Sequence, residues 1–185
     1  MTTPPARVLS VIVCGAGPAE VRTLVKLARE RAWTVQVIAT PAALDFIDAA
    51  ALEAQTGSPV RSQYRKPGEP RSRPADAIIV APAGYNTINK WAQGISDTYT
   101  LGILAEATGL AVPIVVLPFI NSALAARAPF RRSVKELRRE GIRILLGPRG
   151  VEPHQPHTGG NLIDSYPWHL ALGEAERLTP ATRTQ

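Results

Sequence analysis

The sequence of 185 residues has one cysteine, three histidines and only 5% aromatic residues. The single cysteine, Cys14, excludes a framework of disulfides within the chain and a zinc site built from cysteines. No apolar run approaches the roughly 20 residues that a helix needs to span a bilayer. The N-terminal stretch has no basic segment followed by an apolar one, so no signal peptide is expected. These absences favour a soluble cytoplasmic protein.

The overall composition is that of an ordinary globular protein. Hydrophobic residues make up 45% of the chain and charged residues 19%, which is too apolar for a disordered protein. The length suits one domain with a core of its own. The formal net charge of +6 either favours an anionic partner or simply aids solubility.

Short β-branched runs alternate with amphipathic segments along the chain. The runs predict strands at residues 7–14, 33–39, 77–81, 112–117 and 142–146. The amphipathic segments predict helices at residues 19–31, 42–54 (in one or two pieces), 86–108 (with a break near Gly94 left open), about 123–140 and 168–178. This alternation predicts a single α/β domain, doubly wound, whose parallel sheet is covered by helices on both faces.

Two segments are expected to be loops, at residues 57–75 and 147–166, and loops of this length in a compact domain are functional or mobile. The first is basic. Its side chains either close over an acidic substrate or form a solvated or subunit-contacting loop, and both readings stay open. They are Arg61, Arg65, Lys66, Arg71 and Arg73.

A second basic stretch falls within the helix expected at residues 123–140. Its cations alternate with Glu136 and Glu140, which is typical of an exposed helix face with intrahelical ion pairs. No nucleic-acid-binding motif accompanies the charge, so no nucleic-acid partner is expected. The cations are Arg131, Arg132, Lys135, Arg138 and Arg139.

The carboxyl ends of the strands are where a fold of this class binds its ligand. Four segments follow strands and lead into helices, at residues 15–20, 40–41, 82–90 and 118–125. Helix N-termini there offer free N–H groups and a positive dipole end, which suit a phosphate. The first segment has Gly15 and Gly17 but no third glycine, so the dinucleotide-binding fingerprint is absent.

The third segment carries a family resemblance. Ala81-Pro-Ala-Gly-Tyr-Asn-Thr-Ile-Asn-Lys-Trp-Ala-Gln-Gly-Ile-Ser-Asp97 resembles the Pro-x-Ser-Ala-Asn-Thr-x-x-Lys-x-Ala-x-Gly-x-x-Asp signature of the flavin-containing cysteine decarboxylases. That family includes phosphopantothenoylcysteine decarboxylase and the peptidyl-cysteine decarboxylases of lantibiotic biosynthesis, and flavin prenyltransferases are its relatives. The residues in register are Pro82, Asn86, Thr87, Lys90, Ala92, Gly94 and Asp97. Outside this segment Thr40, Phe46, Pro118 and Asn121 also stand at family positions.

The resemblance implies a flavodoxin-like (Rossmann-type) flavoprotein domain over residues 1–178, with a flexible tail at 179–185. It implies FMN held non-covalently, with the phosphate near Gly17, Ala19 and Thr40 and the isoalloxazine ring near residues 84–87. Asn121 is then a catalytic residue that faces the substrate carboxylate. The cofactor-binding set is Gly17, Ala19, Thr40, Phe46, Pro82, Gly84, Tyr85, Asn86 and Thr87. A homo-oligomer, a trimer or a dodecamer, is also implied by the resemblance. No membrane partner is expected, because no apolar run is long enough to span a bilayer.

The chain departs from the family pattern mainly at catalytic positions. The family histidine that lies eight residues before the Ala-Asp of the third strand is replaced by Gly68. The clamp cysteine is missing from the stretch after the fifth strand. Binding positions differ as well: Pro18 replaces a phosphate-binding serine, Gly84-Tyr85 replace Ser-Ala, and Ile120, Leu124 and Ala125 replace Met, Met and Trp.

Two histidines, His154 and His157, lie in the stretch that corresponds to the clamp. Histidine has the right pKa for proton transfer at neutral pH, so either could replace the lost group, and His157 is taken as the catalytic candidate. The alternative is that both are solvated loop residues. With Glu152 they lack the spacing of a metal site, and no metal is expected.

The sequence therefore predicts an FMN-binding flavoprotein that oxidises or decarboxylates a small or peptidyl carboxylate substrate. Two alternatives remain open. One is a regulatory or binding flavoprotein that has lost catalysis, and the other is a flavin prenyltransferase-like enzyme.

Overall fold

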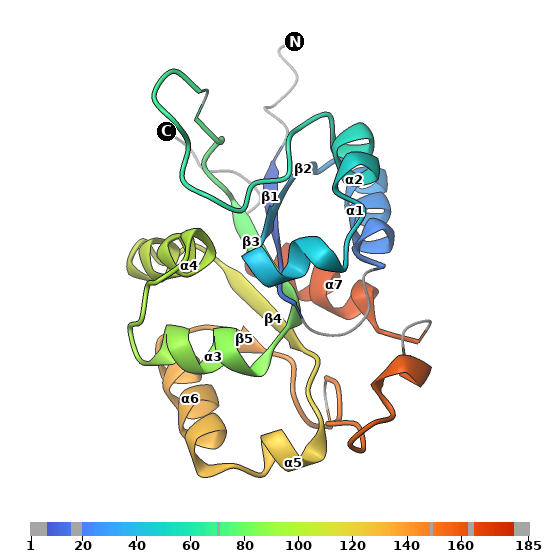
Figure 1. Cartoon of the computed structure of the whole chain (residues 1–185), viewed down its shortest axis with the longest axis vertical. Helices are drawn as coiled ribbons and strands as arrows, with labels where there is room; N and C mark the ends of the chain where they lie inside the picture. The colour runs from blue at the N-terminus through green and yellow to red at the C-terminus, as the bar shows by residue number, and fades with distance from the viewer. Residues whose placement is uncertain (1–6, 16–19, 70, 149, 163–164, 180–185) are drawn as a thin grey trace.

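The computed structural model describes residues 7–15, 20–69, 71–148, 150–162 and 165–179, and it has one parallel sheet at its centre (Figure 1). The sheet order is β2-β1-β3-β4-β5. The chain thus moves outward on one side of β1 and then returns to build the other side, which is the flavodoxin-like order with a switch point between β1 and β3. The strands are β1 (Val8–Val13), β2 (Thr34–Ala39), β3 (Ala77–Ala83), β4 (Ile114–Pro118) and β5 (Arg143–Ile144).

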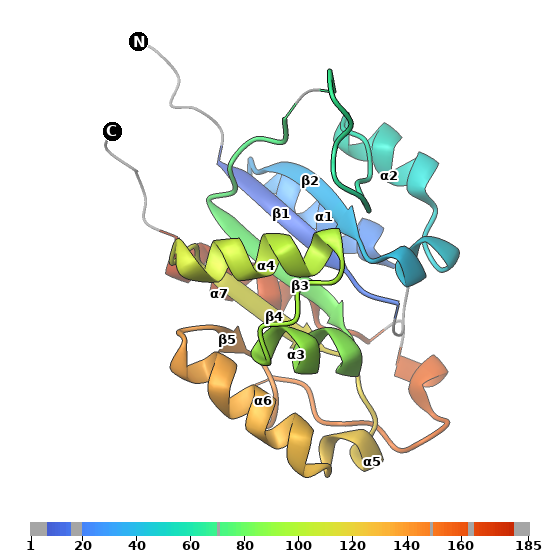
Figure 2. The same ribbon diagram turned by 60° about the vertical axis from the view of Figure 1, so that its left-hand side comes forward.

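Helices cover both faces of the sheet (Figures 1 and 2). One face packs against α1 (Val21–Glu30), α2 (Ala49–Thr56) and α7 (Trp168–Leu178). The other packs against α3 (Tyr85–Ala92), α4 (Tyr99–Gly109) and α6 (Ala128–Arg139). Short helical turns lie at the carboxyl ends of strands or in the last loop: η1 (Pro41–Asp45), α5 (Ser122–Ala125) and η2 (Gly159–Leu162). The doubly wound α/β fold is confirmed.

Alternation along each strand divides the core into two halves. In β1, Leu9, Val11 and Val13 join the α1–α7 side, whereas Ile12 and then Cys14 join the α3–α6 side. All six residues of β1 are buried. A strand buried on both faces needs apolar residues at nearly every position, which is why β1 is apolar at every position except Ser10.

Local capping breaks the long helices that periodicity predicts. The helix expected at residues 86–108 ends at Ala92, passes through Gly94 with a φ of 70°, and resumes at Tyr99. The Thr98 hydroxyl accepts the Leu101 N–H at 3.3 Å and so starts α4 afresh. The region around 123–140 likewise divides into α5 and α6, with proline in the first turn of α6.

One alternative left open above is settled, and two further boundaries differ from expectation. The helical region 42–54 is two pieces, and Asp48 caps the second by accepting the Ala51 N–H at 2.9 Å. The last strand is shorter than residues 142–146. Thr179, assigned above to the tail, is buried, and its hydroxyl donates to the Ala175 carbonyl at 2.6 Å. Residues 180–185 lie outside the described chain. In the described parts, no helix has the length and apolar character to cross a membrane.

Candidate functional site

A cavity of about 550 Å³ opens where the carboxyl ends of β1, β2, β3 and β4 meet. This is the edge of the sheet at which the strand order reverses, between β1 and β3. Segments from four parts of the chain therefore supply its walls. The lining residues are Cys14, Gly15, Thr40, Pro41, Ala42, Gly84, Tyr85, Asn86, Thr87, Lys90, Thr98, Leu101, Phe119, Ile120 and Leu124.

The turns after β1 and β2 hold each other in place. The Gly15 N–H donates to the Thr40 hydroxyl at 3.2 Å, and the Thr40 N–H donates to the Val13 carbonyl at 2.9 Å. Gly15 must be glycine because an added Cβ would lie 2.8 Å from the Cβ of Ala42. The two turns thus form one close-packed corner of the cavity.

The segment after β3 supplies the first turn of a helix to the cavity. The Ala81–Pro82 peptide is cis, and the Pro82 carbonyl accepts the Cys14 N–H at 3.2 Å. Gly84 then caps α3, whose first residues, Tyr85, Asn86 and Thr87, line the cavity. N–H groups in the first turn of a helix have no intrahelical acceptor, so this wall suits an anion or a polar ligand edge.

Cys14 lies at the bottom of this site with 4% of its surface exposed. Burial raises the pKa of its thiol, and hydrogen bonds with the Thr87 side chain and the Gly84 backbone offset only part of that rise. The thiol therefore stays protonated at neutral pH and is a poor nucleophile. The structure agrees with the interpretation of Cys14 as a small buried side chain rather than a substitute for the clamp cysteine.

Two charged residues of the sequence motif pair with each other beside the cavity. The Lys90 ammonium lies 2.6 Å from a carboxylate oxygen of Asp97, across the turn that separates α3 from α4. The pair bridges that turn beside Gly94 and the Thr98 cap, and Lys90 also faces the cavity. This position explains the spacing of lysine, glycine and aspartate in the motif, which sequence reasoning left unassigned.

Most of the described residues expected around the cofactor do line the cavity: Thr40, Gly84, Tyr85, Asn86 and Thr87. Pro82 is buried next to them and contributes its carbonyl rather than a lining surface. Phe46 is 59% exposed and does not line the cavity of the single chain. Gly17 and Ala19, with Pro18, lie outside the described residues.

The sequence did not single out Leu101, and it noted residues 118–125 only as a strand end at which Ile120 and Leu124 depart from the family pattern. Leu101 comes from α4, while Phe119, Ile120 and Leu124 come from the segment after β4. These side chains are apolar and resemble core residues in the sequence. Only the packing of α4 and α5 against the ends of the strands shows that they face a ligand-sized space.

Asn121 caps the short helix α5 beside the cavity. Its Oδ1 accepts the Leu124 N–H at 2.9 Å. The Nδ2 group of the same amide is the donor that could face a ligand. Asn121 is half-buried and is not itself a lining residue, although its neighbours Ile120 and Leu124 are. Its role toward a substrate is therefore argued below as a proposal.

Of the two loop histidines, the structure brings His154 and not His157 to Asn121. His154 forms a β-bridge with Asn121, and its ring centroid lies 4.8 Å from that of Phe119. Its ring also faces a second cavity, of about 160 Å³, on which Phe119, Ile120 and Tyr166 border. His157 is exposed, has a φ of 67° and lines neither cavity.

The basic loop packs across part of the sheet. Arg61, Arg65, Arg71 and Arg73 line a separate cavity of about 610 Å³, together with residues of β1, β2 and α4. The Tyr64 ring meets the Tyr99 ring edge-on at 5.1 Å, and this contact joins the loop to α4. Among the described residues, no group of three or more His, Cys, Asp or Glu side chains could hold a metal ion.

The fold and the site together define a flavodoxin-like α/β protein with a ligand cavity at its topological switch point. The Flavoprotein family model matches residues 7–161, and the chain belongs to that family.

Curated relatives point to the same family. The coenzyme A biosynthesis bifunctional protein CoaBC of Vibrio vulnificus is 30% identical over 137 residues, which cover 70% of this chain and 33% of that protein. CoaBC of Mycobacterium tuberculosis is 28% identical over 180 residues, covering 95% of this chain and 40% of that protein. The chain thus spans between a third and two fifths of the length of these relatives.

Solved structures share the fold. The FMN-dependent cysteine decarboxylase TvaF, from thioviridamide biosynthesis, has a TM-score of 0.69 at 23% identity, over 92% of this chain and 98% of its own. A PPC decarboxylase mutant complexed with pantothenoylaminoethenethiol has a TM-score of 0.65 at 20% identity, over 86% and 96%. The FMN binding protein AtHal3 has a TM-score of 0.64 at 21% identity, over 86% and 94%.

Proposed function

We propose that this chain binds FMN in the 550 Å³ cavity and uses it to oxidise or decarboxylate a small or peptidyl carboxylate substrate. The observation that carries the proposal is that Thr40 and four consecutive residues of the sequence motif, at positions 84–87, line the same cavity. The names of similar proteins support it. TvaF is described as an FMN-dependent cysteine decarboxylase, and AtHal3 as an FMN binding protein.

The cavity has the properties that an FMN site needs. Its volume falls within the range of about 300–1,000 Å³ that is usual for small-ligand pockets. Pro41, Leu101, Phe119, Ile120 and Leu124 offer apolar surface for a planar ring. No acidic residue is among its described lining residues, so no negative charge on these walls repels a phosphate.

Polar groups of this chain are assigned to the two ends of the cofactor. The Thr40 hydroxyl and the turn at Gly15 lie on the phosphate side, as the resemblance implies. Asn86, Thr87 and the first-turn amides of α3, which line the same cavity, are assigned to the ring side by this proposal. When bound, FMN supplies an acceptor for an electron pair from the substrate.

The chain's own contribution to the reaction is to hold the substrate carboxylate. Leu124 N–H donates to Asn121 Oδ1 and so orients the amide, and Nδ2 has no acceptor among the described residues. A donor oriented in advance toward a carboxylate binds it more strongly than a freely rotating one. The neighbouring Ile120 and Leu124 provide apolar surface that keeps water away from the same place.

The first test is an absorbance spectrum of the purified protein, before and after adding FMN. Bands near roughly 375 and 450 nm are the mark of oxidised flavin. Anaerobic titration with cysteine-terminated peptides and with phosphopantothenoylcysteine then tests for bleaching. A colourless protein that also refuses added FMN would overturn the proposal.

Two substitutions test the role of Asn121. Asn121→Ala should keep the flavin but lower turnover by about 100-fold or more. Asn121→Asp keeps an oxygen to cap the Leu124 N–H and places a negative charge toward the carboxylate, so it should lower turnover at least as far. Unchanged turnover in Asn121→Asp would show that the Nδ2 donor does not hold the substrate.

One observation favours a second candidate, a regulatory flavoprotein without catalysis. The titratable groups among the described lining residues are Cys14, Tyr85 and Lys90, and no histidine or carboxylate faces the cavity. A general acid or base suited to neutral pH is therefore absent from these walls. A yellow protein that no thiol substrate bleaches, and whose biological role survives Asn121→Ala, would favour this candidate.

We also propose that the site is completed in a homo-oligomer, a trimer or a dodecamer. The exposed ring of Phe46, a family position outside the cavity of the single chain, supports a second subunit at this edge. Sedimentation equilibrium should give three or twelve times the chain mass of 19.8 kDa. A mass of 19.8 kDa with FMN fully bound would contradict it.

A further inference from the structure

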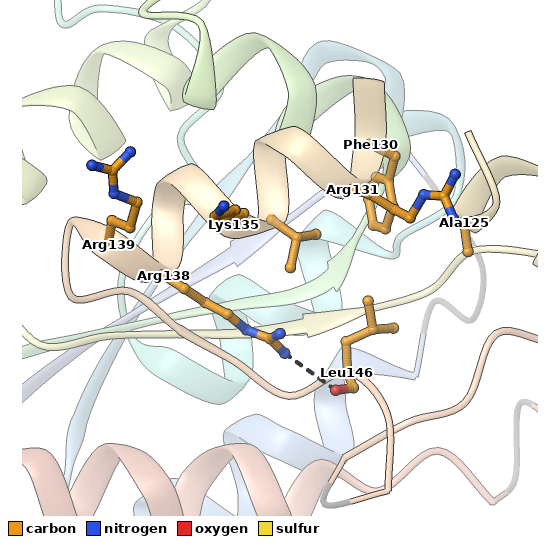
Figure 3. A pocket seen from close by; sticks show the side chains of 8 residues that line it. Ala125, Phe130, Arg131, Lys135, Arg138, Arg139 and Leu146 are labelled. Carbon is orange, nitrogen blue, oxygen red and sulfur yellow. Dashed lines mark hydrogen bonds between the residues drawn. The ribbon is translucent and has the colours of Figure 1, made fainter. Parts of the chain in front are cut away.

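A groove separate from the cofactor cavity lies between α6 and the segment that follows β5 (Figure 3). Its volume is about 460 Å³, and none of its lining residues lines the 550 Å³ cavity. These residues are Ala125, Phe130, Arg131, Val134, Lys135, Arg138, Arg139 and Leu146.

The rim of the groove carries cations of which two are unpaired. Arg139 contacts the Glu136 carboxylate at 3.3 Å, and Arg138 donates to backbone carbonyls. Arg131 and Lys135 are exposed, and no carboxylate of the described chain lies within ion-pair distance of either. None of the described residues that line the groove is acidic. The groove therefore attracts carboxylates or other anions from outside the chain.

The floor of the groove is apolar. Phe130 and Val134 are 1% and 6% exposed, and Ala125 and Leu146 are partly buried beside them. An apolar floor under a cationic rim fits a bulky apolar side chain with negative charges on either side of it.

Arg138 determines how an occupant can bind. Its guanidinium donates to the Ile144 carbonyl at 3.0 Å. It also donates to the Leu146 carbonyl at 3.2 Å (Figure 3). These carbonyls belong to β5, the last strand of the sheet, and to the residues after it. Because the arginine already donates to both carbonyls, they are less available to an added strand, and this favours recognition of an occupant through its side chains.

We propose that this groove docks an acidic segment of a partner protein. One bulky apolar side chain of the segment enters the groove above Phe130 and Val134 and contacts the partly buried Ala125 and Leu146, while flanking carboxylates pair with Arg131 and Lys135. A nucleic acid fits less well because the ring of Phe130 is buried and stacks on Tyr85, so no aromatic face is free for a base. The proposal does not depend on the cofactor or on catalysis.

The test uses the whole chain and a fluorescein-labelled peptide with the core sequence Glu-Glu-Leu-Phe-Glu-Glu, followed by fluorescence polarisation. The variant Arg131→Glu/Lys135→Glu should raise Kd by about tenfold or more. The matched control is Arg22→Glu/Arg132→Glu. It has the same change in net charge, and both of its sites are exposed and outside the groove. Its Kd should stay within about threefold of the wild type.

A second variant separates the groove from the charge. Ala125→Trp places a large ring in the groove without altering a charge, and tryptophan is the residue at this position of the family motif, so the fold should tolerate it. It should raise Kd by about tenfold or more. Replacing Leu-Phe of the peptide by Ser-Ser should do the same.

Several results would overturn the proposal. These are no binding of the acidic peptide, equal weakening by the control pair, or unchanged binding to Ala125→Trp. Tighter binding of a short single-stranded oligonucleotide, lost in Arg131→Glu/Lys135→Glu, would instead identify the groove as a nucleic-acid site.

Discussion

The backbone amide of Ser122 donates a hydrogen bond of 2.7 Å to the carbonyl oxygen of His154. The His154 amide in turn donates to the Ile120 carbonyl at 3.2 Å, so Asn121 lies between two contacts with the same loop residue. The loop after β5 is thereby attached to the start of α5. The ring of His154 packs against that of Phe119 at an interplanar angle of 40°, and Phe119 is a wall of the 550 Å³ cavity.

This arrangement predicts that His154→Ala weakens FMN binding. The ring supports Phe119 from outside the cavity, and an aromatic pair of this kind contributes about 0.5–1.5 kcal/mol. Loss of the ring should therefore raise the Kd for FMN by about 2- to 10-fold, measured by quenching of flavin fluorescence. His157→Ala is the comparison, because that side chain is exposed and lines neither cavity. A larger effect of His157→Ala than of His154→Ala would refute this reading.

Gly15→Ala should destabilise the protein and impair cofactor binding together. The new Cβ would meet the Cβ of Ala42 at 2.8 Å, so the turns after β1 and β2 must separate. Overpacking of this kind costs about 1–3 kcal/mol, measurable by urea unfolding. Gly109→Ala is the control: nothing lies within 4 Å of its added Cβ at the end of α4. Equal stability of Gly15→Ala and the wild type would contradict the close packing of this corner.

Tyr166→Phe should lower the free energy of unfolding by about 1–3 kcal/mol. The buried hydroxyl donates to the Leu117 carbonyl at 2.6 Å, and phenylalanine leaves that acceptor unpaired. Burial also raises the pKa of Tyr166 well above its ordinary value, and the charge of Cys14 adds to the effect.

The raised pKa of Tyr166 gives this prediction a pH dependence. The unfolded chain loses the phenolic proton first, so stability is fully present below the ordinary tyrosine pKa of about 10 and declines above it. Tyr166→Phe should flatten that alkaline decline. An identical decline in both proteins would show that Tyr166 does not cause it.

Glu174→Gln should lower stability modestly at neutral pH. Glu174 accepts from Arg177 at 2.8 Å and lies 3.5 Å from Arg143, so it joins α7 to the edge of the sheet. The hydrogen bond from Arg177 lowers the pKa of the carboxyl, the charges of Arg143 and Arg177 also lower it, and burial partly opposes them. The ion pairs of Glu174 with Arg143 and Arg177 are partly exposed, so the free energy of unfolding should fall by only about 0.5–1 kcal/mol.

Because the pKa of Glu174 is lowered, the stability difference between wild type and Glu174→Gln should depend on pH. A lowered folded-state pKa stabilises the protein above the unfolded-state pKa, and this stabilisation is lost as the pH falls through the folded-state value. Wild type and Glu174→Gln should therefore converge in acid, followed by urea unfolding across pH. Glu140→Gln, at an exposed site, is the control. A difference that persists unchanged in acid would contradict the shift.

Much of the fold follows from local features of the sequence. The apolar runs at β1, β2, β3 and β4 predict buried parallel strands because both faces of such a strand must be apolar. Residues 81–97 carry the family motif in one short segment. The Gly84 cap of α3 and the Lys90–Asp97 ion pair are both formed within it, so the motif can be recognised without knowledge of distant contacts. The breaks between helices depend on equally local groups, such as Gly94 and Thr98, although periodicity alone continues across them.

The sequence by itself therefore determined which segments are helices and strands, their order along the chain and the family. These depend on patterns and contacts among residues that are near neighbours in the chain. Only the tertiary structure decided that Leu101 and Phe119 face the 550 Å³ cavity and that His154 rather than His157 meets Asn121. The physical reason is separation along the chain. Each of these relationships joins elements that adopt their positions only when the sheet is ordered β2-β1-β3-β4-β5, and no local pattern records which distant partner a side chain will face.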